Sequence, residues 1–178
     1  MKFASTVLLG ALCAAPAMAQ QVGEYTGTMQ DGSSVTIDVG TDPNTGKLEV
    51  TTIGFGVTDI CQNSKETLFY VGVGLGDGHD ISSKGKLSYA SDEFFDIDLV
   101  TNMTFKGNKS VSGKGAAYLA AFNPAIGHEK LTTKTQACIS PSQSFTATFS
   151  GTDVSRALPA GTVVVHRADG TSTMRQGN

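Results

Sequence analysis

Carboxylate residues are the first candidates for chemistry in this sequence. Asp96 and Asp98 lie two positions apart in a segment of alternating polar and apolar residues, and Glu93 begins that segment. If 93–100 is a strand, both aspartates lie on one face, about 7 Å apart. That spacing falls between the carboxylate separations of retaining and inverting glycosidases, so we expect the solvated face of a half-exposed strand. A small jelly-roll hydrolase that acts on polysaccharide is the alternative.

A second group has the residue types of a metal site. Asp77, His79 and Asp80 are close together in the sequence, but they would hold a divalent ion only if a distant carboxylate joined them. The other two histidines, His128 and His166, fall in an expected loop and in the tail, and no G-x-S-x-G motif accompanies them. We therefore expect exposed histidines, no metal and no cofactor.

Glycines recur with period two at Gly72, Gly74 and Gly76. A phosphate-binding loop would need a G-x-G-x-x-G or G-K-[ST] pattern at the start of a helix, and neither is present. The pattern instead indicates a strand with one bare face, which lets an aromatic ring or another sheet approach closely.

The first residues have the composition of a secretory signal. Lys2 precedes an apolar run over 7–15, and the A-x-A sequence that ends at Ala19 predicts cleavage after that residue. The run is shorter than the roughly 20 residues that span a bilayer. Leu12 stands where lipoprotein processing needs a small residue. The expected location is therefore the periplasm or the extracellular medium.

Two cysteines remain after that cleavage, Cys61 and Cys138. An even pair in an oxidising compartment predicts a disulfide. Closing a loop of this length would stabilise the fold by at most roughly 4 to 5 kcal/mol in the chain-entropy model. Two buried free thiols are the alternative, whereas a zinc site would need more ligands nearby.

Composition argues against several partner classes. The net charge is −3 at pH 7, and the chain has no run of basic residues, so neither nucleic acid nor anionic lipid is an expected partner. No apolar run after the signal is long enough for membrane insertion. The partner is left unknown, as a protein or a glycan.

Alternation of period two dominates the remainder. Residues 35–39 alternate apolar and polar side chains, and Asp31-Gly32 before them predicts a two-residue type I′ turn joining two strands over 22–39. About nine to eleven short strands with frequent turns make the chain all-β. We expect an antiparallel β-sandwich of jelly-roll or immunoglobulin-like type, with a small β-barrel as the alternative.

Other segments set the boundaries of these elements. Gly54-Phe55-Gly56 predicts a break between two strands, 78–80 predicts a loop, and 116–122 fits a strand or a short helix. The expected organisation is a signal over 1–19, a β-domain over 20–150, and a linker with a flexible tail over 151–178. That last segment allows one short hairpin.

The order of short motifs resembles a family of secreted bacterial β-sandwich modules of uncharacterised function. The motifs are Gly23-Glu24-Tyr25-Thr26-Gly27, Gly32, Val35-Thr36-Ile37-Asp38-Val39, Cys61, Phe105-Lys106-Gly107, Ser112-Gly113, Cys138-Ile139-Ser140 and Phe145-Thr146-Ala147. Members often carry Trp where this chain has Phe145. The resemblance covers about residues 22–150 and implies export, a sandwich fold and a Cys61–Cys138 link. It implies no reaction.

Three functions are compatible with these observations. A non-catalytic exported module that binds a protein partner or a surface glycan fits best, because every matching motif is structural. The alternatives are the jelly-roll hydrolase and an inhibitor of a secreted hydrolase, with a protruding loop at 77–83 or 121–129. Asn102 and Asn108 begin glycosylation motifs that matter only in a eukaryotic host.

Overall fold

Eleven strands and no helix form the secondary structure of the part of the chain that the structure describes. The computed structural model describes residues 20–61, 66–90, 97–120, 136–153, 158–159, 161–167 and 170–176. The strands are β1 (Gly23–Met29), β2 (Ser34–Thr41), β3 (Leu48–Cys61), β4 (Glu66–Asp80), β5 (Lys86–Ala90), β6 (Ile97–Lys106), β7 (Ser110–Ala120), β8 (Gln136–Ile139), β9 (Gln143–Gly151), β10 (Thr162–Arg167) and β11 (Ser172–Gln176). The all-β class is thereby confirmed.

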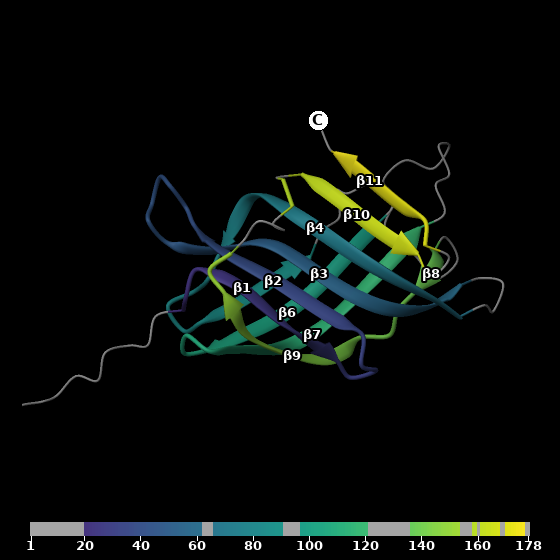
Figure 1. Cartoon of the computed structure of the whole chain (residues 1–178), viewed down its shortest axis with the longest axis horizontal. Helices are drawn as coiled ribbons and strands as arrows, with labels where there is room; N and C mark the ends of the chain where they lie inside the picture. Colours follow the sequence, from purple (N-terminus) through teal and green to yellow (C-terminus); the bar gives the residue numbers. More distant parts are fainter. Residues whose placement is uncertain are drawn as a thin grey trace, which may run out of the picture.

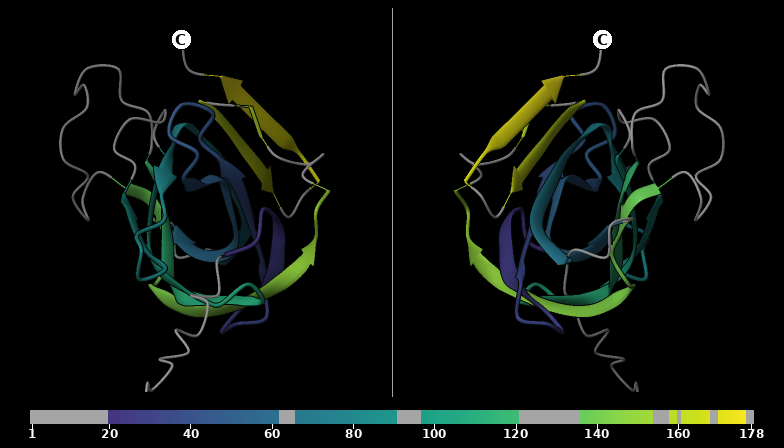
Figure 2. Two further views of the ribbon diagram at one scale, coloured as in Figure 1. Left: turned by 90° about the vertical axis from the view of Figure 1, so that its left-hand side faces the viewer. Right: turned by 90° about the vertical axis from the view of Figure 1, so that its right-hand side faces the viewer.

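All eleven strands belong to one antiparallel sheet. Its order is β11-β10-β4-β3-β2-β1-β9-β7-β6-β5, and β8 pairs with both β3 and β7 off this path. The sheet curls strongly, so that β6 and β7 lie behind β1 to β3, with β9 along the bottom between them (Figure 1), and the strands surround a common interior (Figure 2). The result is a half-barrel. The finer choice between a sandwich and a barrel is not confirmed.

The opening hairpin forms as predicted, but its turn is longer. The N–H of Met29 donates to the carbonyl of Ser33, and the N–H of Gly32 donates to that of Met29. These bonds enclose three residues, 30–32, and Gly32 has φ 87°. A three-residue turn with glycine in the left-handed region also suits a hairpin, so the predicted two-residue turn is wrong while the hairpin is confirmed.

The core lies inside the curl, where aromatic rings pack on bare glycine positions. Phe55 on β3 and Phe145 on β9 are buried with ring centroids 5.3 Å apart. A Cβ built on Gly115 of β7 would lie 2.5 Å from the Phe55 ring, and one on Gly113 would lie 2.9 Å from the Phe145 ring. The missing side chain at Gly115 therefore lets the Phe55 ring of β3 reach across the interior to β7, whereas Gly113 makes room for Phe145, its direct partner on the neighbouring strand β9.

A second aromatic group closes one end of that interior. Tyr25 on β1 is fully buried and makes edge contacts with Phe105 and Phe149, both with centroids 5.5 Å away. Its hydroxyl donates to the Gln21 carbonyl and accepts from the Gln21 N–H, both at 3.1 Å. The ring thus contributes apolar burial while its polar atom keeps its partners.

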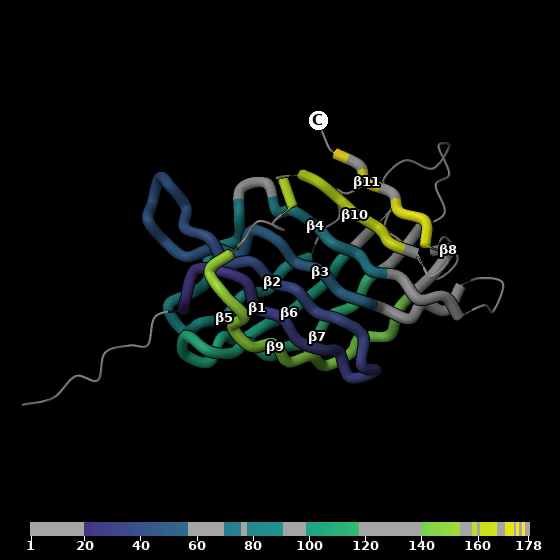
Figure 3. The backbone as a smooth tube through the Cα atoms, viewed as in Figure 1, coloured from purple at the N-terminus to yellow at the C-terminus, as the bar shows by residue number. Residues whose placement is uncertain are grey.

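Two local predictions are overturned by strand pairing. β3 runs unbroken through Gly54-Phe55-Gly56, and β4 continues through His79 and Asp80, which pair with Val50 and Glu49. Glycines that look like chain breaks instead give room to neighbouring groups, such as the Tyr70 side chain over Gly54. The path of both strands can be followed in Figure 3.

Two further segments form strands. For the first, the sequence left the choice between strand and short helix open, and for the second it favoured a flexible tail. The stretch from Ala116 to Ala120 is the end of β7, so the strand option holds for that part. Residues 172–176 form β11, which pairs with β10 in a hairpin. The hairpin that the sequence allowed after Gly151 is therefore present, and Thr171 to Gln176 are not a structureless tail.

The Gly115 position generates a stability prediction. In Gly115→Ala the new methyl group would collide with the buried Phe55 ring, so we expect the free energy of unfolding to fall by about 1 to 3 kcal/mol, measured by urea titration. Gly151→Ala is the control, because its Cβ would meet only the Asp153 nitrogen at 3.9 Å. Equal stability of the two variants would contradict the packing described here.

Candidate functional site

The outer face of the sheet, opposite the hydrophobic core, carries a group of polar side chains that we call the outer-face cluster. Its members come from four adjacent strands and are Glu24, Thr36, Asp38, Thr52 and Tyr70. Register brings them together, because Glu24 pairs with Asp38 across β1 and β2, and Asp38 pairs with Thr52 across β2 and β3.

Strand alternation explains why Asp38 points to this face. Its neighbours Ile37 and Val39 are fully buried in the core cluster, so the residue between them faces the opposite side. Outer faces are normally solvated, yet Asp38 has 0% of its surface exposed. A second layer of chain must therefore cover it.

That layer is the segment just before β10. The N–H of Leu158 donates to Thr52 Oγ1 at 3.1 Å, and the N–H of Gly161 donates to the carbonyl of Gly74 at 3.0 Å. Leu158 and Pro159 pass so close to Gly72 and Gly74 that a Cβ on either glycine would crowd them. The bare glycine face predicted from sequence thus receives a chain segment as well as the Tyr70 ring.

Burial leaves Asp38 in an unusual electrostatic state. Neither of its carboxylate oxygens has a hydrogen-bond partner. Burial, and then the negative charge of Glu24, raise the pKa of the Asp38 carboxyl from 3.8 to about 6, while the Thr52 hydroxyl acts in the opposite direction. Buried polar groups are normally satisfied, and Asp38 is the exception among the described side chains.

The other members of the outer-face cluster contribute carboxylate and hydroxyl oxygens and the Tyr70 ring to the surroundings of Asp38. Burial raises the pKa of Tyr70, and a hydrogen bond with Thr36 lowers it. The Tyr70 ring lies 5.7 Å from that of His166, whose Nδ1 is 2.7 Å from Ser172 Oγ. A β-bulge at Thr51 interrupts the register next to Asp38, and bulges often occur beside functional sites.

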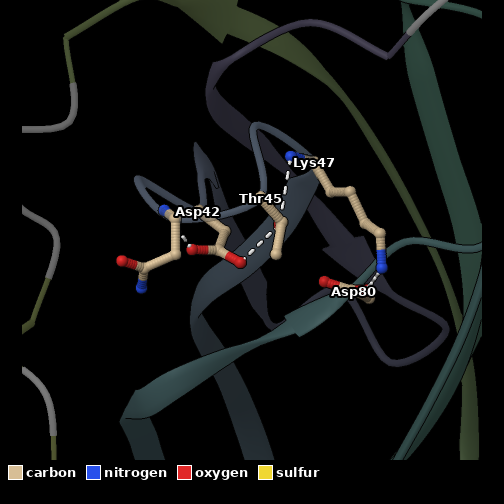
Figure 4. Close-up of polar contacts among 5 residues, drawn as sticks. Asp42, Thr45, Lys47 and Asp80 are labelled. Atoms are coloured by element: carbon tan, nitrogen blue, oxygen red, sulfur yellow. Dashed lines mark hydrogen bonds and ion pairs between the residues drawn. The ribbon is translucent and has the colours of Figure 1, made fainter.

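The predicted metal ligands lie elsewhere and are engaged separately. Asp80 forms an ion pair with Lys47 at 2.6 Å beside the turn after β2 (Figure 4). The His79 ring contacts Tyr89, with centroids 4.7 Å apart, and the side chain of Asp77 lies outside the described set. Among the described residues, no three or more His, Cys, Asp or Glu side chains are grouped together, at this position or elsewhere.

The turn itself is held by Asp42. Its carboxylate accepts hydrogen bonds from the Asn44 N–H at 2.8 Å and from the Thr45 hydroxyl at 2.5 Å. The bond from Thr45, followed by that from Asn44, lowers the pKa of Asp42. Together with the hydrogen bond from the Gly46 N–H to the Asp42 carbonyl, these contacts hold the turn over 42–46.

The carboxylates proposed for a hydrolase are not placed by the structure. Glu93 and Asp96 lie outside the described residues, and Asp98 is described only by its backbone, which pairs with Tyr118 of β7. Asn102 is exposed on β6, and Asn108 lies in the turn before β7. The hydrolase therefore stays a prediction.

The two cysteines are brought directly opposite each other. Cys61 at the end of β3 pairs with Cys138 of β8. Opposed residues of an antiparallel pair have Cα atoms about 4.5 to 5.5 Å apart, within the range that a disulfide requires. No disulfide occurs among the described side chains, and those of the two cysteines are not part of that set, so the bond stays a prediction.

Sequence reasoning missed the outer-face cluster. The stretch Val35–Val39 indicates a half-exposed strand, and an aspartate in its polar row carries no local sign of burial. Glu24 likewise stands among the alternating residues of β1. Only the pairing of β1 with β2, and the crossing of Leu158 some 106 positions from Thr52, create the site.

The outer edge of the sheet is a second candidate for function. Among the described residues β11 pairs only with β10, so one row of its backbone N–H and C=O groups faces away from the sheet (Figure 1). Met174 on this strand has 67% of its surface exposed, the largest value among the exposed large hydrophobic residues.

Comparison with known proteins gives no match of any kind. A scan of protein-family models finds none that matches the chain, and searches of curated proteins and of solved structures give no match either. The resemblance to secreted bacterial modules therefore stays a prediction. None of the residues that the structure describes forms a helix of the length and hydrophobicity that a membrane crossing requires.

The cysteine register generates one prediction. Protein recovered from an oxidising compartment should yield a Cys61–Cys138 linked peptide when it is digested without reduction and analysed by mass spectrometry. The double variant Cys61→Ser, Cys138→Ser should lose about 2 to 5 kcal/mol of stability. Quantitative alkylation of both thiols in unreduced, denatured protein would show that the bond does not form.

The state of Asp38 generates a second prediction, about pH. Because the folded protein holds this proton to a higher pH than the unfolded chain, stability should fall as the pH rises from 3.8 to about 6. Asp38→Asn removes the charge, so we expect it to be more stable than the wild type above pH 7 by on the order of 2 kcal/mol. At pH 4 the two should be similar, as measured by chemical denaturation.

Asp42→Asn is the control for that experiment. The pKa of Asp42 is lowered in the folded protein, so the stability that its charge contributes is present above pH 4 and is lost as the pH falls. Its replacement should therefore reduce stability at neutral pH, the opposite sign to Asp38→Asn. Parallel pH profiles for wild type and Asp38→Asn would refute the assigned state of Asp38.

Proposed function

We propose that this protein is an exported, non-catalytic module that binds a protein partner through the β11 edge of its sheet, with a surface glycan as the other ligand class. The open row of backbone groups on β11 supports the proposal. An extended segment of a partner can add to such an edge as a further strand, gaining main-chain hydrogen bonds.

The exposed Met174 of β11 favours recognition over protection. Sheet edges that avoid association commonly carry lysine, proline or a bulge, whereas the described part of this strand exposes Met174 and contains no proline. A flexible thioether side chain adapts to many apolar surfaces. An added strand could therefore pair with the backbone and cover this side chain.

The proposal also concerns the shape of the domain. β8 pairs with β3 on one side and with β7 on the other, which supports the barrel alternative over two separate facing sheets. A barrel closed at β8 would still leave β11 as an outer edge, because β10 and β11 extend beyond β4. Export rests on the signal over 1–19, which lies outside the described residues.

Site-specific crosslinking tests this function. A photoreactive residue at Met174, introduced into the full-length protein in its own host, should give one discrete adduct with a partner protein. The same residue at Asn44, exposed in the turn before β3, serves as the control and should give none. Met174→Lys should reduce partner binding at least severalfold without loss of stability, because edge lysines oppose strand addition.

Other outcomes separate the alternatives. Equal adducts at both positions, or none at Met174, would contradict recognition through this edge. Turnover of a glycan panel by the purified protein would instead support the hydrolase, whose residues Glu93, Asp96 and Asp98 would then be the first to replace. Inhibition of a secreted hydrolase would favour the inhibitor.

A further inference from the structure

The unsatisfied carboxylate of Asp38 is the starting point for a separate inference. The side chain is fully buried, and neither oxygen makes a well-aligned hydrogen bond, although the Thr52 hydroxyl lies close enough to lower the pKa of the carboxyl. A buried charge is normally paired or bound to a metal, because its desolvation is otherwise costly. Replacing the aspartate with an apolar residue would remove the cost, so a functional use of this charge needs a ligand that supplies the missing interactions.

The groups around Asp38 define the chemistry of that ligand. Glu24 lies directly opposite on β1, and its negative charge faces Asp38 closely enough to affect the pKa of the latter. Cross-strand neighbours have Cβ atoms about 5 Å apart, so the two carboxyl groups can both reach an ion placed between them. The described surroundings include no lysine or arginine that pairs with either carboxylate.

The other donors of the outer-face cluster are oxygens as well. Thr52 Oγ1 lies beside Asp38, and the Thr36 hydroxyl is bonded to that of Tyr70. Ser150 donates to Glu24 Oε1 at 3.1 Å, which orients this carboxylate. A set of carboxylates and hydroxyls without sulfur suits hard cations rather than zinc or copper.

We propose that Asp38 and Glu24 bind one calcium ion on the outer face of the sheet, beneath the segment that contains Leu158 and Pro159. The ion's two positive charges balance the two carboxylates, and Thr52 Oγ1 with backbone carbonyl groups and water complete the oxygen shell. Calcium fits better than magnesium, because it accepts irregular geometry and carboxylates from different elements, whereas magnesium demands a near-ideal octahedron.

Because the site is enclosed by protein, a small ion suits it better than an organic cation. Asp38, Thr52 and Thr162 have 0%, 2% and 1% of their surfaces exposed, and Leu158 is hydrogen-bonded to Thr52 above them. An alkylammonium group is larger than a metal ion and would have to displace more of this segment. The site is independent of partner binding at β11.

Calcium titration of the full-length protein after export tests the proposal. Isothermal calorimetry at pH 7.5 should show one site per chain, with a dissociation constant in the 10⁻⁴ to 10⁻³ M range or tighter, as for other extracellular calcium modules. Calcium should raise the melting temperature, because it binds the folded state, and magnesium at the same concentration should raise it less. Absence of a calcium signal would overturn the proposal.

Three variants locate the site. Asp38→Asn should abolish binding, and Glu24→Gln, at a partly exposed position that leaves Asp38 intact, should weaken it about tenfold or more. Asp80→Asn, which removes an exposed carboxylate in the ion pair with Lys47, should bind calcium as the wild type does. Unchanged binding by Asp38→Asn, or loss in Asp80→Asn alone, would refute the assignment. If Asp38→Asn fails to fold, Glu24→Gln decides.

Discussion

The packing of two aromatic rings onto glycines inside the curl is the constraint on which the rest of this structure depends. Phe55 and Phe145 contact each other in the interior, and each occupies space that a side chain at Gly115 or Gly113 would fill. A flat sheet would leave one face of these rings in water. Curling buries both rings and brings β3 near β7, and β8 then hydrogen-bonds to both.

The outer face of the sheet also has glycine positions that other groups fill, but the residues covered there are polar. Gly72 and Gly74 again leave space, but here Leu158 and Pro159 fill it and cover a polar row instead of an apolar one. Covering Asp38 without giving it a partner has an energetic cost that a purely structural role would not require. The contrast between the well-packed interior and this unsatisfied carboxylate is why function is sought on the outer face.

The fold was predictable from the sequence where apolar and polar residues alternate along a strand. It was not predictable where the decisive contacts join residues that are far apart in the chain. The hairpin of β1 and β2 and the buried row of β9 follow from apolar residues at every second position. Gly54-Phe55-Gly56 resembles a break only until Tyr70 is placed over Gly54. Residues 172–176 look like a polar tail by themselves, yet they become ordered by pairing with β10.

What the sequence determined by itself is the all-β class and, for strands with clear alternation such as β2 and β9, the side that is apolar, because alternation is a property of neighbouring residues. It also supplied the two cysteines, but not their alignment. Tertiary structure alone decided the curl, the opposition of Cys61 to Cys138, and the burial of Asp38 beneath Leu158. Each of these depends on which strands become neighbours, and contacts between residues a hundred positions apart leave no periodic signal in the chain.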